Sequence, residues 1–217
     1  MTAGSSKTGG PAKAGHDIGG PPEGARLRAK RSGEASPKAR WRRGHYESTI
    51  RVGISACLLG QEVRYDGGHK HAGFLVDAFG PSVEWVAVCP EVEAGFGTPR
   101  EPVQLSRADG AIRLVTVTTR RDLTAPMNEL IRRRLPELRL EELSGYILKA
   151  SSPSCGPGQV KLFDQHGTTS VESGRGLFAE ALIRQFPALP VEDEGRLADP
   201  RLLEDFVTRV FAYRRSA

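Results

Sequence analysis

Three cysteines each follow an apolar run that is typical of a buried strand. The runs are residues 50–57 (IRVGISAC), 83–89 (VEWVAVC) and 145–150 (GYILKA), and they lead to Cys57, Cys89 and Cys155. Open α/β sheets bind their ligands outside the carboxyl ends of the strands. If the three runs are parallel strands of one sheet, all three thiols emerge at that edge. Three thiolates gathered there can hold a metal or an iron–sulfur cluster and leave one coordination position open, as a catalytic site needs.

The surroundings of the cysteines favour a site over simple core packing. A free cysteine often behaves as a small buried hydrophobe, but Cys89 precedes Pro90-Glu91 and Cys155 lies in the run PSCGPG. Proline and glycine mark loops and strand ends, not core interiors. Disulfides explain the set poorly, because the number of cysteines is odd and no secretory signal opens the chain. We therefore expect free thiols in a reducing cytoplasm.

Three segments together resemble the thiouracil desulfidase family, which was long known only as a domain of unknown function. They are residues 54–70 (ISACLLGQEVRYDGGHK), 88–105 (VCPEVEAGFGTPREPVQL) and 151–158 (SSPSCGPG), and the resemblance extends over about residues 50–213. It implies a Rossmann-like α/β fold and a 4Fe–4S cluster held by Cys57, Cys89 and Cys155. It also implies removal of sulfur from a thiolated pyrimidine, with catalytic roles for Glu91 and Ser152.

Iron and zinc are the two candidates for three thiolates. Structural zinc normally takes a fourth Cys or His ligand and pairs its cysteines at C-x2–4-C spacing, and no two cysteines of this chain are that close. His69 and His71 are the nearest histidines, and His71 stands where a helix is expected to begin. A cluster with one open iron fits better, since such an iron is a soft Lewis acid toward a thiocarbonyl sulfur.

The same motifs contain candidate acid–base and substrate-binding residues. Glu91, two residues after a ligand cysteine, suits acid–base work, and the alternative is a surface carboxylate. Ser152 can relay a proton or, alternatively, satisfy its own turn. Arg64, Tyr65 and Arg100 are expected to line the substrate pocket, with Tyr65 stacking on a pyrimidine ring. The alternatives are that Tyr65 seals its loop and that Arg100 pairs with a nearby glutamate, Glu93 or Glu101.

The basic charge of the chain belongs to its first residues. Residues 1–44 contain ten Lys/Arg and three acidic residues, whereas the remainder has 21 and 23. The stretch is rich in Gly, Pro, Ala and Ser, so we expect residues 1–45 to form a disordered basic tail and residues 46–217 a single α/β domain. The tail is either a weak electrostatic arm for nucleic acid or a dispensable extension, and we favour the extension because charge runs are usually solvated.

Strands alternating with helices indicate a three-layer α/β domain with a mainly parallel sheet. Helices are expected over residues 71–79, 124–134, 177–186 and from Asp199 onward, with Thr124 capping the second. Residues 112–118 can form an edge or hairpin strand and 160–163 a short one. No apolar run reaches the length of a membrane span. The chain stops at Ala217, where similar proteins often continue, so we expect a stand-alone enzyme domain. The sequence leaves open whether it forms a homodimer.

The sequence therefore predicts an iron–sulfur enzyme that desulfurates a thiolated pyrimidine, such as 2- or 4-thiouracil, and releases sulfide and the oxo-base. Three alternatives remain open. In the first, the enzyme acts on a thiolated nucleoside or tRNA. In the second, the protein is a non-catalytic iron–sulfur sensor or carrier. In the third, it is a plain α/β binding module with structural cysteines.

Overall fold

The computed structural model describes residues 49–164 and 169–216, all of which belong to the unit Arg43–Ala217. The expected tail, residues 1–45, lies outside the described residues, so the domain boundary at residue 46 stays a prediction. Along the described part of the chain, no helix combines the length and the apolar character needed to cross a membrane.

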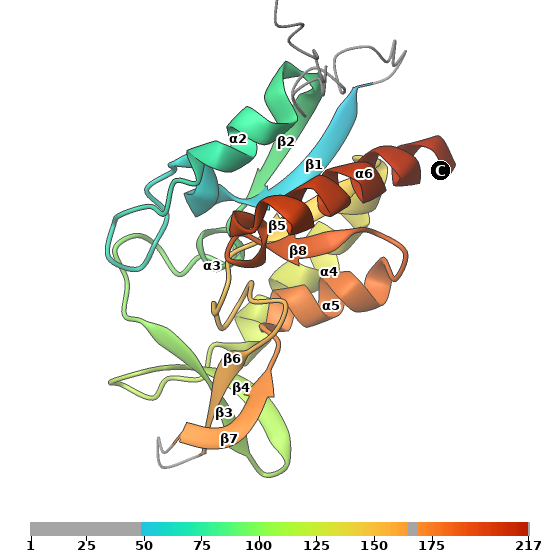
Figure 1. Cartoon of the computed structure of the whole chain (residues 1–217). Helices are drawn as coiled ribbons and strands as arrows, with labels where there is room; N and C mark the ends of the chain where they lie inside the picture. Colours follow the sequence, from blue (N-terminus) through green and yellow to red (C-terminus); the bar gives the residue numbers. More distant parts are fainter. Residues whose placement is uncertain (1–48, 165–168, 217) are drawn as a thin grey trace, which may run out of the picture. The chain divides into compact units, whose positions relative to one another are not determined.

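Four parallel strands form the main sheet. Their spatial order is β2 (Val83–Val88), β1 (Ile50–Ser55), β5 (Gly145–Leu148) and β8 (Val191–Asp193), as Figure 1 shows. All four residues of β5 are buried, as expected for parallel strands that are covered on both faces. The three runs that precede the cysteines are thus neighbours in one parallel sheet, and their carboxyl ends lie along the same edge.

Helices cover both faces of this sheet and give the three layers expected from the sequence (Figure 1). On one face lie α2 (Gly73–Phe79) and α6 (Pro200–Ser216), where the rings of Phe79 and Phe206 meet edge to face at a centroid distance of 6.1 Å. On the other face lie α4 (Thr124–Leu140) and α5 (Leu177–Gln185). Here Tyr146 of β5 packs against Phe178 of α5 within the larger apolar core. The predicted α/β fold with a mainly parallel sheet is confirmed.

A second four-stranded sheet was not expected. Its order is β4 (Ala111–Thr116), β3 (Val103–Ala108), β6 (Val160–Asp164) and β7 (Thr169–Gly174), with antiparallel pairs at both edges. Leu105 and Leu162 of this sheet pack against Met127 and Leu130 in the first half of α4. The second half of α4 packs on the main sheet through Leu135 and its neighbours. One helix therefore contributes to both cores.

Several expected boundaries are wrong in detail. The strand of residues 50–57 ends at Ser55, and Cys57 lies in a 3-10 turn, η2 (Ala56–Leu59). The segment after Cys89 begins with a one-turn helix, α3 (Pro90–Glu93), and two more 3-10 turns cover η3 (Gly80–Ser82) and η4 (Arg196–Ala198). Helix α4 continues to Leu140 with Pro136 inside it.

Thr124 does not cap α4. Its hydroxyl accepts the backbone N–H of Leu114 at 2.9 Å, which ties the helix start to β4. The carboxylate of Asp122 instead accepts the backbone N–H of Thr124 at 2.8 Å. An acceptor just before a helix satisfies one of its free N–H groups, so Asp122 takes the role that the sequence suggested for Thr124.

Candidate functional site

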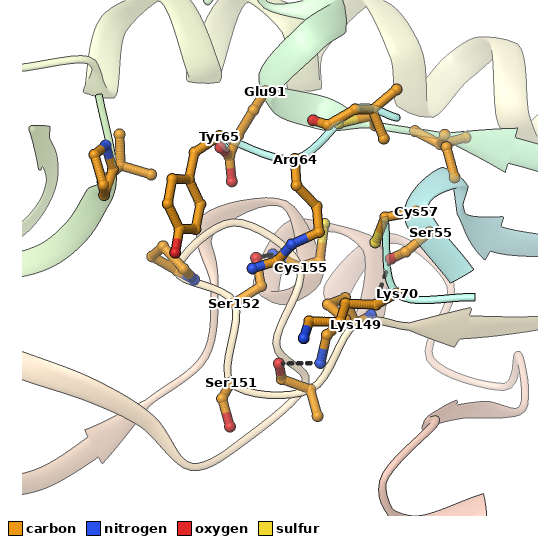
Figure 2. A pocket seen from close by; sticks show the side chains of 18 of the residues that line it. Ser55, Cys57, Arg64, Tyr65, Lys70, Glu91, Lys149, Ser151, Ser152 and Cys155 are labelled. Carbon is orange, nitrogen blue, oxygen red and sulfur yellow. Dashed lines mark hydrogen bonds between the residues drawn. The ribbon is translucent and has the colours of Figure 1, made fainter. Parts of the chain in front are cut away.

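A cavity of about 350 Å³ lies at the carboxyl ends of β1, β2 and β5. The thiols of Cys57, Cys89 and Cys155 all line it, together with Glu91 and Ser152. Figure 2 shows the cavity with the side chains that surround it. The sequence analysis expected these five residues to meet at this edge of the sheet, and the structure places all five on one cavity.

Cys57 is held by the tight turn that follows β1. Its carbonyl accepts the backbone N–H of Lys70 at 2.9 Å and of Gly60 at 3.3 Å. Gly60 closes the turn with a φ of 88°, a left-handed conformation that glycine adopts without steric cost. The chain consequently reverses directly after the cysteine, and the segment that includes Lys70 returns to the cavity.

Cys89 sits between the end of β2 and the start of α3. Its backbone N–H donates to Oε1 of Glu93 at 3.2 Å, so that carboxylate satisfies one free N–H at the helix start. Glu93 is in turn paired with Arg134 of α4 at 3.2 Å. The Cys89 thiol lies 3.8 Å from the carbonyl of Val63, on the loop opposite.

Cys155 is positioned by a compact loop that leaves no room for larger residues. Its backbone N–H donates to the hydroxyl of Ser152 at 3.1 Å, and the neighbouring N–H of Gly156 donates to the carbonyl of Ser152 at 2.8 Å. A Cβ on Gly156 would lie 2.4 Å from Cγ2 of Val160, and one on Gly176 would lie 2.4 Å from the backbone of Ser154. Gly156 can approach Val160, and Gly176 can approach the backbone of Ser154, only because glycine has no Cβ.

Burial keeps the three thiols protonated when no metal is bound. It raises the pKa of Cys57 to about 11, with the neighbouring Cys89 adding to the effect and Lys149 and Arg64 opposing it. The pKa of Cys89 is raised by burial. Burial raises the pKa of Cys155 well above its ordinary value, and Cys89 adds to that rise while a hydrogen bond from Ser55 opposes it. The sulfurs thus lie close enough to influence each other's ionisation.

Three cysteines on one cavity match the ligand set of an iron–sulfur cluster. Within the described ranges, no group of three His, Cys, Asp or Glu side chains is arranged to hold one metal ion. Ligands of one zinc must all converge at about 2.0–2.3 Å, whereas thiolates that bind different irons of a cluster are separated by the cluster itself. His69 and His71 are not among the residues that line the cavity.

Glu91 is the best-anchored carboxylate of the cavity. Nε and Nη2 of Arg100 each lie 2.8 Å from its Oε2, and the hydroxyl of Ser154 donates to its Oε1 at 2.9 Å. The side chains of Arg100 and Glu91 are only 7% and 13% exposed. A carboxylate has two acceptor positions on each oxygen. Arg100 occupies both positions on Oε2, and Oε1 keeps one for a molecule in the cavity.

Ser152 forms the turn contacts that its sequence suggested and also lines the cavity. Its Oγ accepts the backbone N–H of Cys155 and, at 3.3 Å, that of Ser154, as a turn residue would. Figure 2 shows the same side chain at the cavity wall beside Cys155. Because both N–H groups occupy the oxygen, the hydroxyl proton remains as the group that can face a ligand.

Arg64 and Tyr65 also line the cavity (Figure 2). The guanidinium of Arg64 lies 5.3 Å from the centre of the Tyr65 ring, and Tyr65 is 40% exposed. Nε of Arg64 is buried without a hydrogen-bond partner and lies 3.6 Å from Oδ1 of Asp66, which is ion-pair range but too long for a hydrogen bond. These side chains are placed where the sequence expected a substrate-binding wall.

The sequence did not indicate three other residues around the cavity. Ser154 is fully buried and reaches Glu91. Ser55 accepts the backbone N–H of Lys149 at 2.9 Å, and Glu194 forms an ion pair with Nζ of Lys149. Ser154 lies inside a recognised motif, but Glu194 follows β8, a three-residue strand without a sequence signal.

Glu101 has a different role from the one considered for it. The sequence suggested it as an ion-pair partner of Arg100, but its carboxylate accepts the backbone N–H groups of Thr118 and Thr119 at 2.5 and 2.7 Å. It is not among the residues that line the cavity. The hydroxyl of Thr119 also donates to Oε2 at 2.6 Å, and this bond, together with the two backbone bonds, lowers the pKa of Glu101. Its carboxylate therefore stabilises the turn after β4.

Three comparisons show which known proteins this chain is similar to. A model of the 2-thiouracil desulfurase family matches residues 52–194. The Bacillus subtilis (strain 168) protein YbbK, itself uncharacterized, is 34% identical over 140 residues, which cover 61% of this chain and 88% of that protein. A solved structure of the 4Fe–4S-dependent thiouracil desulfidase TudS is 33% identical with a TM-score of 0.54, over 71% of this chain and 97% of that one. All five cavity residues named first lie inside the family match.

Proposed function

The chain belongs to the 2-thiouracil desulfurase family, and from this premise we propose that it removes sulfur from a thiolated pyrimidine such as 2- or 4-thiouracil. The family resemblance read from the sequence is thereby confirmed. Family membership and the similarity to TudS make the protein an iron–sulfur enzyme of the desulfidase type with a 4Fe–4S cofactor. The substrate and the roles of individual residues are our proposal.

One observation carries the proposal: three thiols, a carboxylate and a serine hydroxyl line the same cavity. We assign Cys57, Cys89 and Cys155 as the residues that would hold the cluster. When bound, a cluster with three cysteine ligands supplies an iron with an open position, which acts as a soft Lewis acid toward sulfur. The thiols must lose their protons to become ligands, so cluster binding also overcomes their raised pKa values.

The proposed reaction is a hydrolysis without net oxidation or reduction. The oxygen of one water forms the new C=O bond, the C–S bond breaks, and sulfur leaves as sulfide. The protons of the water are shared between the sulfide and the ring or solvent. A base for the water and a proton donor near the substrate are therefore the two groups that the protein must supply.

We assign Glu91 as the base. Its Oε2 is occupied by Arg100, so the one remaining acceptor position on Oε1 receives the proton of the attacking water. The held orientation matters because a base must lie within hydrogen-bond reach of its proton.

We assign Ser152 as the proton-donating partner of the substrate. Its oxygen accepts two backbone N–H groups, which leaves its own proton to point toward a ring nitrogen or exocyclic atom. Tyr65 offers an aromatic face for the pyrimidine, and Arg64 offers donors for its polar atoms.

A direct assay tests the function. The protein is loaded with iron and sulfide without oxygen and incubated with 2-thiouracil or 4-thiouracil, and the oxo-base and sulfide are measured together. Equal amounts of both products support the proposal. A cluster-loaded protein that releases neither product would favour the sensor or carrier alternative. Activity on a thiolated nucleoside or tRNA, but not on the free base, would show that the substrate is the nucleoside or tRNA.

A further inference from the structure

Arg100 is nearly buried, and protein groups take almost all of its donors. Nε and Nη2 lie against Oε2 of Glu91, while Nη1 donates to the carbonyls of Val63 at 3.0 Å and Gly97 at 2.8 Å. A guanidinium has five N–H donors, and these contacts occupy four. The side chain thus has little left to offer a substrate.

The same residue joins two walls of the cavity. Its backbone N–H donates to the carbonyl of Tyr65 at 2.8 Å, and its side chain holds the carbonyl of Val63. The segment of residues 63–65 carries Arg64 and Tyr65, the expected substrate wall. On the other side, Arg100 holds Glu91 at the end of β2. The Val63 carbonyl also faces the thiol of Cys89 at 3.8 Å.

We propose that Arg100 is a positioning residue that fixes the Glu91 carboxylate and the 63–65 segment relative to each other. The proposal rests on the desulfuration proposed above and replaces the substrate-binding role that the sequence suggested for Arg100. Arginine is required because its planar fork reaches a carboxylate and two carbonyls in fixed directions, which the single ammonium of a lysine cannot reproduce.

Ser154 completes the arrangement from the opposite side. It is fully buried, and its hydroxyl donates to Oε1 of Glu91. Arg100 and Ser154 therefore hold the two oxygens separately, which prevents the carboxyl group from rotating. Ser154 belongs to the loop that positions Cys155, and Glu91 itself follows Cys89 by two residues, so this bond connects the segments of two of the three cysteines.

The test compares Arg100→Lys and Arg100→Ala with Arg51→Lys in the cluster-loaded protein. Arg51 forms an exposed ion pair with Glu84 and serves as the matched control. We expect both Arg100 variants to keep their iron content and visible spectrum. We expect kcat for thiouracil to fall roughly 10–100-fold, the usual effect of removing a partner that orients a working residue, while KM changes by a few-fold or less. Free guanidinium at a non-denaturing concentration should restore part of the kcat of Arg100→Ala, and methylammonium should not.

A readout independent of activity is hydrogen exchange. The backbone N–H of Arg64 donates to the carbonyl of Gly68, and that of Gly67 donates to the carbonyl of Arg64. Both should exchange faster in Arg100→Lys than in the wild type. Hydrogen exchange does not depend on turnover, so it tests the positioning role even if the wild type does not act on thiouracil. Failure of the proposed function can thus be told apart from failure of the positioning role.

Three results would overturn the proposal: a wild-type kcat in Arg100→Lys, a rise in KM with kcat unchanged, or unchanged exchange in the 63–68 segment. A rise in KM alone would return Arg100 to substrate binding. If the Arg100 variants do not fold, Ser154→Ala tests the same arrangement from Oε1. It should lower kcat in the same direction with the cluster retained, and a wild-type kcat there would contradict the orienting role.

Discussion

Replacing Glu91 with glutamine removes the negative charge of the side chain and keeps its shape. Glutamine keeps the size of the side chain and can still bond Ser154 and Arg100, but it cannot accept the proton of a water. We expect cluster content to be retained and sulfide release to fall by roughly 10²–10⁴-fold, the usual effect of losing a general base. At about 1.4 kcal/mol per factor of ten, this is about 3–5 kcal/mol of activation free energy.

The same change should also lower stability. Arg100 and Glu91 are 7% and 13% exposed, and removing one partner of a buried ion pair costs roughly 3–5 kcal/mol because the other charge remains buried. Because the pair borders a cavity, we use the lower end of this range, so the free energy of unfolding should fall by about 3 kcal/mol. For a chain of this size each kcal/mol lowers Tm by about 2–4 °C, so Glu91→Gln should unfold about 6–12 °C lower.

The control is Glu84→Gln, which breaks the exposed pair with Arg51 at 3.1 Å. Exposed pairs contribute about 0–1 kcal/mol, so Tm and activity should hardly change. The assay is anaerobic thermal unfolding and sulfide release on matched, cluster-loaded proteins. Glu91→Gln with activity within a few-fold of wild type would refute the assignment of the base, and an unchanged Tm would refute the energetic reading of the buried pair.

Three further predictions test the loop of Cys155, the thiols and the tail. Gly156→Ala should lower iron content per chain, because its Cβ would lie 2.4 Å from Cγ2 of Val160; a normal iron content would show that the loop adapts. In cluster-free protein, Cys57 should react slowly with iodoacetamide at pH 8 and faster as the pH approaches its raised pKa of about 11; rapid labelling at pH 8 would contradict this. A chain that begins at Tyr46 should fold and desulfurate thiouracil at the wild-type rate, and loss of activity on tRNA alone would instead support a nucleic-acid role for the tail.

The main sheet was predictable because its strands are nearly uninterrupted apolar runs. Residues 50–55 and 145–148 are buried at every position except Arg51, and residues 83–88 are apolar apart from Glu84. Such strands leave a clear signal. Strand β3 was missed because Gln104, Ser106 and Arg107 interrupt its pattern. Strand β8 was missed because it has only three residues, two of them acidic. Two strands of the second sheet were expected, at residues 112–118 and 160–163, but the missed β3 lies between them, so their pairing into one sheet could not be predicted.

The sequence was sufficient to predict which residues form the candidate site, but not which hydrogen bonds and ion pairs connect them. The cysteines gather because parallel strands bring their carboxyl ends together. The partner of Arg100 could not be predicted, because Glu91, Glu93 and Glu101 all lie within reach in sequence. The choice of Glu91 depends on the turn of α3, which directs Glu93 toward Arg134 instead.

The most direct test of the central claim is the iron and inorganic sulfide content of three single variants, Cys57→Ser, Cys89→Ser and Cys155→Ser, each measured beside wild type after anaerobic reconstitution. If the three thiols hold one cluster, wild type should contain iron and inorganic sulfide in equal amounts, and each variant should lose the visible absorption band and the release of sulfide from thiouracil. A single variant that keeps full iron content and full activity would show that its cysteine is not a ligand and would contradict the site as assigned.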